Sequence, residues 1–354
     1  MSDAPKVSAV IPTYNNEGTI AGTLESALAQ RFDGGVEVIA VNDGSTDGTR
    51  AVLQKFGDRI RVIDQENRGV AAARNAGIAA ARGKYIALLD GDDTWTEDKI
   101  AKSVAPLDNN PECVAVYSNV IQVNAAGRVM SCYVPPEYRH APTLDEMLKR
   151  PWPLLPSAIV IRRSTLVAIG GFREDFGRRA LGGEDTFAFL LVREQGEIHF
   201  VPDKLVRYRI SDARESFVKR AHLAERTRGS RDGAEPGKIF EGHLVFARLV
   251  RERFGTRGRA IIRFSFDQAG GSLVNLGMVA MHEGNPAFAR RCYLASLQYR
   301  PLMLKTYLRL AWATLPRGVS QRLAPMLAPG LRRSLAGPPF SQLQELAAAG
   351  NRDQ

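Results

Sequence analysis

The sequence predicts an α/β fold, in which helices flank a mostly parallel sheet and an α-helical C-terminal region follows. Short β-branched runs alternate with helix-period segments through residues 1–95, a pattern typical of a parallel sheet covered on both faces. Beyond Ile239 the apolar spacing is helical. The chain has 354 residues, 44% of them hydrophobic and 24% charged, which suits a large core or one domain with an appendage.

Four apolar runs in the first part predict strands. We expect them at 7–11, 36–41, 60–63 and 85–89. The runs are rich in valine, isoleucine and leucine, and the first, second and fourth end in Pro12, Asn42 and Asp90 respectively, residues that favour turns.

Helices are expected between these strands. Their approximate positions are 19–30, from 46 onward and 70–81. The first helix places Ile20, Leu24 and Leu28 on one face. Thr46 or Asp47 can cap the second, and the third is rich in alanine.

The remaining chain is mixed and then helical. We expect strands at 114–123, 157–161 and 199–201, helices from Thr94, over 185–194, and near 240–253, 270–283, 286–299 and 301–314. The expected domain organisation is an α/β domain at 1–215 with halves at 1–95 and 96–215, a linker or mobile loop at 216–238, a helical region at 239–316 and a loosely ordered tail at 317–354.

Charge is unevenly distributed along the chain. The net charge is +10, and residues 241–333 alone contain 15 Lys or Arg against 4 Asp or Glu. Such a region can attract anionic lipid headgroups or nucleic acid, or simply form a solvated helical surface.

The cysteines and the apolar runs of the sequence indicate where in the cell the protein is located. Cys113, Cys132 and Cys292 form no CxxC pair, which indicates reduced thiols. No signal-peptide pattern and no apolar run long enough to cross a bilayer are evident in the sequence. We therefore expect a cytoplasmic protein, with a peripheral position on the inner face of the cell membrane left open.

Polar residues follow each of the four expected parallel strands. Ligands of open α/β sheets bind beyond the carboxyl ends of the strands. The corresponding segments here are Pro12–Tyr14, Asp43–Ser45, Glu66–Gly69 and Asp90–Asp93. Candidate functional residues are therefore expected in these turns.

The turn Asp90-Gly91-Asp92-Asp93 carries three carboxylates in four residues. Their mutual repulsion favours a bound divalent cation, and hard oxygen ligands suit Mg²⁺ or Mn²⁺. Gly91 allows close approach of the backbone to a ligand. The alternative, an exposed cap for a helix opening at Thr94, accounts for Asp93 alone.

Asp43, Arg74, Glu184 and Asp185 are further candidates. Asp43 can accept hydrogen bonds from a ligand, or belong only to a strand-to-helix turn. Arg74 can reach a nucleotide or form a surface salt bridge. The acids at 184 and 185 can cap a helix, or one can remove a proton from an acceptor hydroxyl.

Five motifs occur in a fixed order. They are V-I-P-T-Y-N (10–15), V-N-D-G-S-T-D (41–47), N-R-G-V-A-A-A-R-N-A-G (67–77), L-L-D-G-D-D (88–93) and G-G-E-D (182–185). Together they resemble glycosyltransferase family 2, whose members have a GT-A, Rossmann-like fold. The resemblance covers about residues 6–210, more than half of the chain.

This resemblance implies an inverting, metal-dependent hexosyltransferase. It would move a sugar from a nucleotide diphosphate sugar, with UDP favoured, to a hydroxyl of a glycan or lipid-linked glycan in cell-surface polysaccharide synthesis. Pro12 and Tyr14 would line the base and ribose pocket, Asp43 would bind the base, and Arg74 would support the nucleotide. No nucleic-acid partner is implied.

The acids acquire roles through the same resemblance. Asp90 and Asp92 would be the acids of the DxD motif, with Asp90 near the ribose and both serving a Mn²⁺ or Mg²⁺ ion that neutralises the leaving diphosphate. Asp185 would be the general base, and Glu184 would support it or contact the sugar. Many relatives have a histidine where this chain has Ser211, so Arg209 is a candidate substitute.

Other interpretations remain open at the level of sequence. A catalytically silent relative could bind a nucleotide sugar or act as a scaffold. A nucleotidyltransferase is disfavoured because residues 12–17 lack a Gly-rich, Lys-containing phosphate loop. The processive Gln-x-x-Arg-Trp motif is absent. The apolar segment 302–312 could contact an anionic membrane, pack on other helices or form a homodimer.

Overall fold

The structure is a computed structural model that describes residues 5–133, 140–149, 152, 154–176, 183–210, 236–282 and 286–315. The chain divides into two compact units. Unit 1 comprises Met1–Asp212 with Val245–Ile262, and unit 2 comprises Ala213–Leu244 with Arg263–Gln354. Of the linker expected at 216–238, residues 216–235 lie outside the described residues, as do the tail at 317–354, Gly182 and Ser211. Residues 236–238 are not linker, because a helix begins at Pro236.

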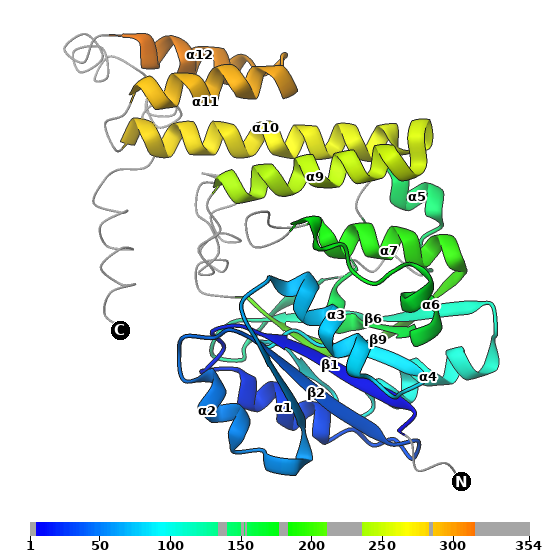
Figure 1. The fold of residues 1–354 in the computed structure, drawn as a ribbon. Coiled ribbons are helices and arrows are strands. Elements are labelled where there is room, and N and C mark those ends of the chain that lie inside the picture. Colours follow the sequence, from blue (N-terminus) through cyan, green and yellow to red (C-terminus); the bar gives the residue numbers. More distant parts are fainter. Residues whose placement is uncertain are drawn as a thin grey trace. The chain divides into compact units, whose positions relative to one another are not determined.

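Unit 1 is built on a nine-stranded mixed sheet (Figure 1). Its strands are β1 (Val7–Thr13), β2 (Val36–Asp43), β3 (Arg61–Gln65), β4 (Tyr85–Leu88), β5 (Thr94–Trp95), β6 (Cys113–Val123), β7 (Val129–Cys132), β8 (Ile159–Arg162) and β9 (Glu197–Arg209). Their order is β3-β2-β1-β4-β8-β6-β9-β5, with β7 beside β6. The first four strands are parallel to one another, and β6 is parallel to β9.

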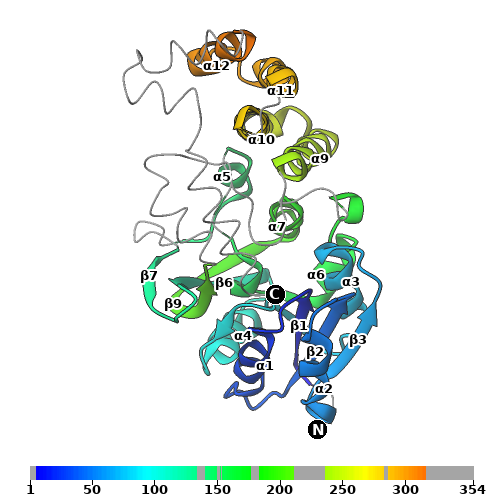
Figure 2. The same ribbon diagram turned by 90° about the vertical axis from the view of Figure 1, so that its left-hand side faces the viewer.

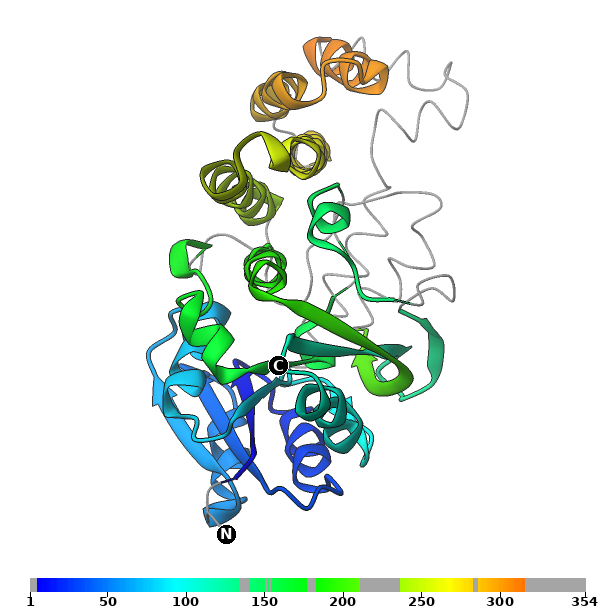
Figure 3. The same cartoon turned by 90° about the vertical axis from the view of Figure 1, so that its right-hand side faces the viewer.

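Helices cover both faces of this sheet, as Figures 2 and 3 show from opposite sides. They are α1 (Ile20–Leu28), α2 (Thr49–Gln54), α3 (Val70–Ala80), α4 (Lys99–Asn109), α6 (Arg163–Ala168) and α7 (Glu184–Gln195). The helix α5 (Leu144–Lys149) packs against α7. The helix α3 lies close to the sheet because Gly77 has no side chain. A Cβ at this position would clash with a methyl of Val10. The predicted mostly parallel α/β fold is confirmed.

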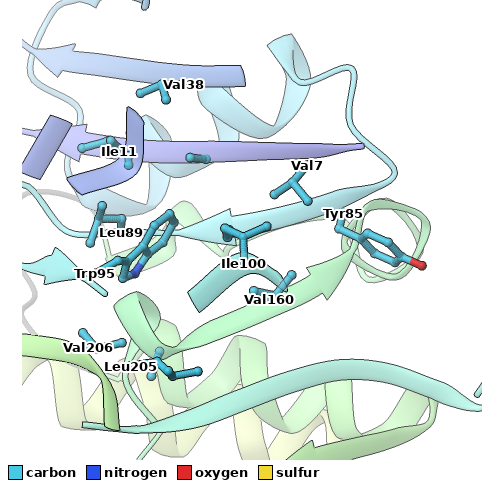
Figure 4. Packing of buried hydrophobic residues seen from close by; sticks show 14 of the residues in the cluster. Val7, Ile11, Val38, Tyr85, Leu89, Trp95, Ile100, Val160, Leu205 and Val206 are labelled. Atoms are coloured by element: carbon cyan, nitrogen blue, oxygen red, sulfur yellow. The ribbon is translucent and has the colours of Figure 1, made fainter. Parts of the chain in front are cut away.

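One hydrophobic core covers the face of the sheet opposite α3 (Figure 4). There Val7 and Ile11 of β1 pack with Tyr85 of β4, Ile100 of α4 and Trp95, all buried. The core therefore fixes the strand β1 and the segment after β4, whose carboxyl ends carry the candidate site.

Three sequence expectations in unit 1 were wrong in detail. Residues after Asp93 do not open a helix, because Thr94–Trp95 pairs antiparallel with β9 and α4 begins only at Lys99. The segment expected as a strand from residue 157 begins with a 3₁₀ turn, Pro156–Ala158. The strand expected at 199–201 is 13 residues long, since pairing with both β6 and β5 extends it.

The C-terminal region is helical, as predicted. Its helices are α9 (Pro236–Phe254), α10 (Arg259–His282), α11 (Pro286–Tyr299) and α12 (Leu304–Thr314). In unit 2, Ala289 and Tyr293 of α11 pack with Val274 of α10 and Ala313 of α12. None of the described helices is both long and apolar enough to cross a membrane.

Candidate nucleotide-sugar site

Loops after β1, β2 and β4 meet at the carboxyl end of the sheet. The Thr19 and Thr23 hydroxyls, which follow β1, donate to the Gly91 carbonyl at 2.9 and 3.1 Å. The Asn15 amide donates to the Ser45 hydroxyl at 3.1 Å. The expected grouping of these strand ends is therefore observed.

Asp43 organises the turn that precedes α3. Its carboxylate is buried and accepts hydrogen bonds from the amides of Arg68 and Gly69 at 2.9 and 2.8 Å. The Gln65 side-chain amide donates to it as well, at 2.7 Å. Asp43 thus ties the end of β2 to the end of β3, and its oxygens have several protein partners.

Pro12 and Tyr14 lie at the end of β1. Pro12 is buried within the strand, whereas Tyr14 is 47% exposed. The Tyr14 amide donates to the Asn16 side-chain oxygen at 3.0 Å, and Asn15 has a positive φ of 52°. This turn holds the Tyr14 ring at the surface, where it can pack against a planar group.

The turn Asp90–Asp93 fits closely against the first loop. A Cβ at Gly91 would stand 2.8 Å from the Asn16 side-chain oxygen and 3.2 Å from the Thr13 hydroxyl. A larger residue at 91 would push the two loops apart. The close approach expected of this glycine is therefore made to the protein's own Asn16 and Thr13.

Asp93 is 1% exposed and holds the turn from within. Its carboxylate accepts the Ser157 hydroxyl at 2.6 Å and the Arg209 amide at 2.9 Å. The Asp90 amide donates to the same Ser157 hydroxyl at 3.1 Å. Burial, with the charges of Asp92 and Asp90, raises the pKa of Asp93 well above its ordinary value. The expectation that Asp93 is an exposed helix cap was wrong.

Arg74 joins two motifs that lie far apart in the sequence. Its guanidinium contacts Asp90 at 3.0 Å and Glu184 at 3.4 Å, although Glu184 lies 110 residues further along the chain. The side chain is 3% exposed and stands over the Phe172 ring, 5.2 Å from its centroid. The alternative of a surface salt bridge is therefore wrong.

Burial and neighbouring charges shift the pKa values of Arg74 and of the two acids. Burial alone lowers the pKa of the Arg74 guanidinium, but Asp90, Glu184 and Asp185 together raise it above its usual value. Burial and then the Asp185 charge raise the pKa of Glu184 to about 7. Burial also raises the pKa of Asp185. Buried acids with raised pKa values are candidates for acid–base chemistry.

The first turn of α7 positions these two acids. Gly183 precedes the helix with a φ of 101°, a conformation that favours glycine. A Cβ there would also meet Phe246 of α9 at 3.2 Å. The Asp185 carboxylate accepts the Thr186 amide at 2.6 Å.

The donor set suits a cation shared with a substrate. Among the described residues, no three His, Cys, Asp or Glu side chains converge on a point where they could hold a metal ion. Asp90 and Asp92 supply two hard carboxylates, and Mg²⁺ or Mn²⁺ commonly completes such a set with water and phosphate oxygens. The residues present therefore fit a metal that binds together with a diphosphate.

Sequence reasoning missed several supporting residues. Ser157 links Asp90 to Asp93, and Phe172 packs under Arg74. Thr19 and Thr23 hold Gly91. None carries a local signal, because a serine after a proline or a threonine in a helix has many ordinary roles.

Comparisons with known proteins agree with this architecture. Residues 8–155 match the family model described as glycosyl transferase family 2. An uncharacterized glycosyltransferase of Rickettsia typhi is 31% identical over 231 residues, covering 63% of this chain and 69% of that protein. The putative teichuronic acid biosynthesis glycosyltransferase TuaG of Bacillus subtilis is 44% identical over 104 residues, 28% of this chain and 41% of that protein.

A solved structure shows the same fold at low sequence identity. S. aureus TarS 1-349, in complex with UDP-GlcNAc, superposes with a TM-score of 0.55 at 18% identity and covers 93% of this chain and 90% of that one. The α/β fold and the strand-end acids define a GT-A glycosyltransferase architecture. The chain belongs to glycosyltransferase family 2. It spans less than half the length of two of its curated relatives, 41% and 48%.

Proposed function

We propose that this chain is an inverting, metal-dependent glycosyltransferase. It moves a sugar from a nucleotide diphosphate sugar, with a UDP sugar favoured, to a hydroxyl of a glycan or lipid-linked glycan. The observation that carries the proposal is the Arg74 guanidinium, which contacts Asp90 of the metal motif and Glu184 beside the candidate base. Donor-binding and proton-accepting groups thereby share one site.

In this proposal the chain's residues have the following roles. Tyr14 packs on the base, Asp43 shapes the base pocket, and Pro12 lines it. Asp90 and Asp92 would hold a Mn²⁺ or Mg²⁺ ion, which supplies the positive charge that stabilises a departing diphosphate. Asp185 takes the proton of the acceptor hydroxyl, and Glu184 supports it. Direct attack by the acceptor inverts the anomeric carbon.

Relatives support the broad substrate class. TuaG is described as acting in teichuronic acid biosynthesis, and TarS is described in complex with UDP-GlcNAc. We therefore propose a UDP sugar as donor and a role in cell-surface polysaccharide synthesis.

A panel of UDP sugars, incubated with manganese, tests the proposal. We expect UDP release from at least one donor, loss of release with a chelator, and loss in Asp92→Asn. Val167→Ser, which changes an exposed residue of α6, is the matched control. Binding of the donor without turnover would instead favour the silent relative, and pyrophosphate release from a nucleoside triphosphate would favour a nucleotidyltransferase.

A further inference from the structure

Helix α12 presents an apolar face to solvent within unit 2. Leu304 is 70% exposed, Tyr307 46% and Leu308 42%. Spacings of three and four residues place these side chains on one side of the helix. Leu302, two residues before the helix begins, is 94% exposed, so the apolar surface extends to the segment that precedes α12.

The opposite side of α12 is already packed. Ala313 is buried in the unit 2 core, and Leu310 packs against the same cluster. Thr306 is buried as well. Figure 2 shows α12 beside α11. The exposed leucines therefore do not belong to the face that folds the helix onto its own unit.

This apolar surface lies in a stretch of single-sign charge. Between Glu283 and Glu345 the sequence contains nine Lys or Arg and no Asp or Glu. Lys305 of α12 is exposed, whereas Arg309 is half-buried and burial lowers its pKa. A helix with an apolar stripe beside an exposed cation is suited to an anionic lipid surface, where the stripe enters the acyl boundary and the cation faces headgroups.

A second copy of the chain fits these charges poorly. A twofold contact through α12 would bring the same helix of both copies together, and α12 contains Lys305 and Arg309 but no Asp or Glu that could offset the repulsion. An anionic bilayer supplies both an apolar interior and the missing negative charge.

We propose that the face of Leu302, Leu304, Tyr307 and Leu308 docks this protein on an anionic membrane surface. The inference goes beyond the transfer reaction and does not depend on it, because the proposed docking residues lie outside the residues assigned to donor binding. A failure of vesicle binding would therefore contradict only the docking inference, and a failure of UDP release would contradict only the proposed function.

Co-sedimentation of the full chain with phosphatidylcholine vesicles, with and without phosphatidylglycerol, tests the inference. We expect binding only to the anionic vesicles and weaker binding at high salt. The double substitution Leu304→Ser with Leu308→Ser should weaken the binding by at least about tenfold. Lys305→Glu should weaken it less, and each variant should keep its circular dichroism spectrum.

Val167→Ser is the matched control, because it removes a 65% exposed apolar side chain on α6. It should leave vesicle binding unchanged. Absence of binding to anionic vesicles, or binding that survives the double substitution, would overturn the inference. A dimer seen by light scattering that dissociates on the double substitution, without vesicle binding, would assign this face to a second copy instead.

Discussion

The Arg74 guanidinium lies 3.0 Å from the Asp90 carboxylate while its own side chain is 97% removed from solvent. A buried cation of this kind neutralises the acids that surround it, and its planar fork can bind two carboxylates at fixed angles. Arg74 therefore links the turn Asp90–Asp93 to α7.

Substitution of Arg74 by lysine should uncouple these two motifs. A single ammonium cannot reproduce both contacts, so Asp90 and Glu184 would repel each other with less compensation. We expect kcat/KM for UDP release to fall by about a hundredfold, which corresponds to about 2.7 kcal/mol. Arg68→Lys is the control, since Arg68 is an exposed partner of Glu174. Equal losses in the two variants would argue against a specific role for Arg74.

Substitution of Ser157 by alanine should loosen the turn Asp90–Asp93, the proposed metal-binding turn. The change removes the hydroxyl that donates to Asp93 and accepts from the Asp90 amide, and leaves the buried Asp93 with fewer donors. We expect a loss of unfolding free energy of about 1–3 kcal/mol, measured by urea denaturation. The KM for manganese should also rise.

Ser118→Ala is the comparison for that experiment. Within the part of the chain that the structure describes, the Ser118 hydroxyl is buried and makes no hydrogen bond. Its removal should leave the KM for manganese unchanged. If Ser157→Ala also kept the wild-type KM for manganese, the role of Ser157 in positioning Asp90 and Asp93 would be contradicted.

The pH profile of turnover should reflect the buried acids of α7. Glu184 has a pKa of about 7, above its unfolded value, so its ionised form appears only as the pH rises through about 7. We expect kcat/KM to rise over this interval. In Glu184→Gln the rise of kcat/KM with pH should occur at lower pH, because the carboxylate that ionises near pH 7 has been removed. An unchanged rise would assign the ionisation to another group.

Lys99 offers a test that is independent of catalysis. It is completely buried, where its ammonium donates to the Ser103 hydroxyl and the Ala158 carbonyl. Burial lowers its pKa from 10.5 to about 7. The unfolded state therefore binds a proton that the folded state does not, and stability falls as the pH drops from about 10.5 to about 7.

Lys99→Met should remove that dependence and raise the unfolding free energy at pH 7. Urea denaturation at pH 7 and pH 10 measures the unfolding free energy, and Lys55→Met, at an exposed position, is the control. If the unfolding free energy changed equally between pH 7 and pH 10 in wild type and in Lys99→Met, Lys99 would not be the group that causes the pH dependence.

Local pattern was sufficient for much of the fold. The parallel strands β1 to β4 were predicted because each is a short apolar run, three of them ending in residues that favour turns, with helix-period segments between them. The prediction failed around Thr94 and Glu197, where tertiary pairing decides the structure. The two residues of β5 are a strand only because β9 lies beside them, and no local pattern in the sequence contains that contact.

The candidate site was predictable to a similar extent. The acids were found because charged residues after apolar strands stand out, and the grouping of their turns follows from a parallel sheet. Asp93 was misinterpreted because its partner Ser157 is 64 residues away. Arg74 was left between two roles, since burial of a helical arginine depends on Phe172 and Glu184, which come from distant segments.

The anomeric configuration of the first sugar released tests the central claim most directly. Time-resolved proton NMR can follow the panel donor that is turned over in the presence of manganese, with water as acceptor. The account predicts a first product of configuration opposite to the donor, formed by wild type and reduced about a hundredfold or more in Asp185→Asn. A first product that keeps the donor's configuration, or undiminished turnover in Asp185→Asn, would contradict direct displacement assisted by Asp185.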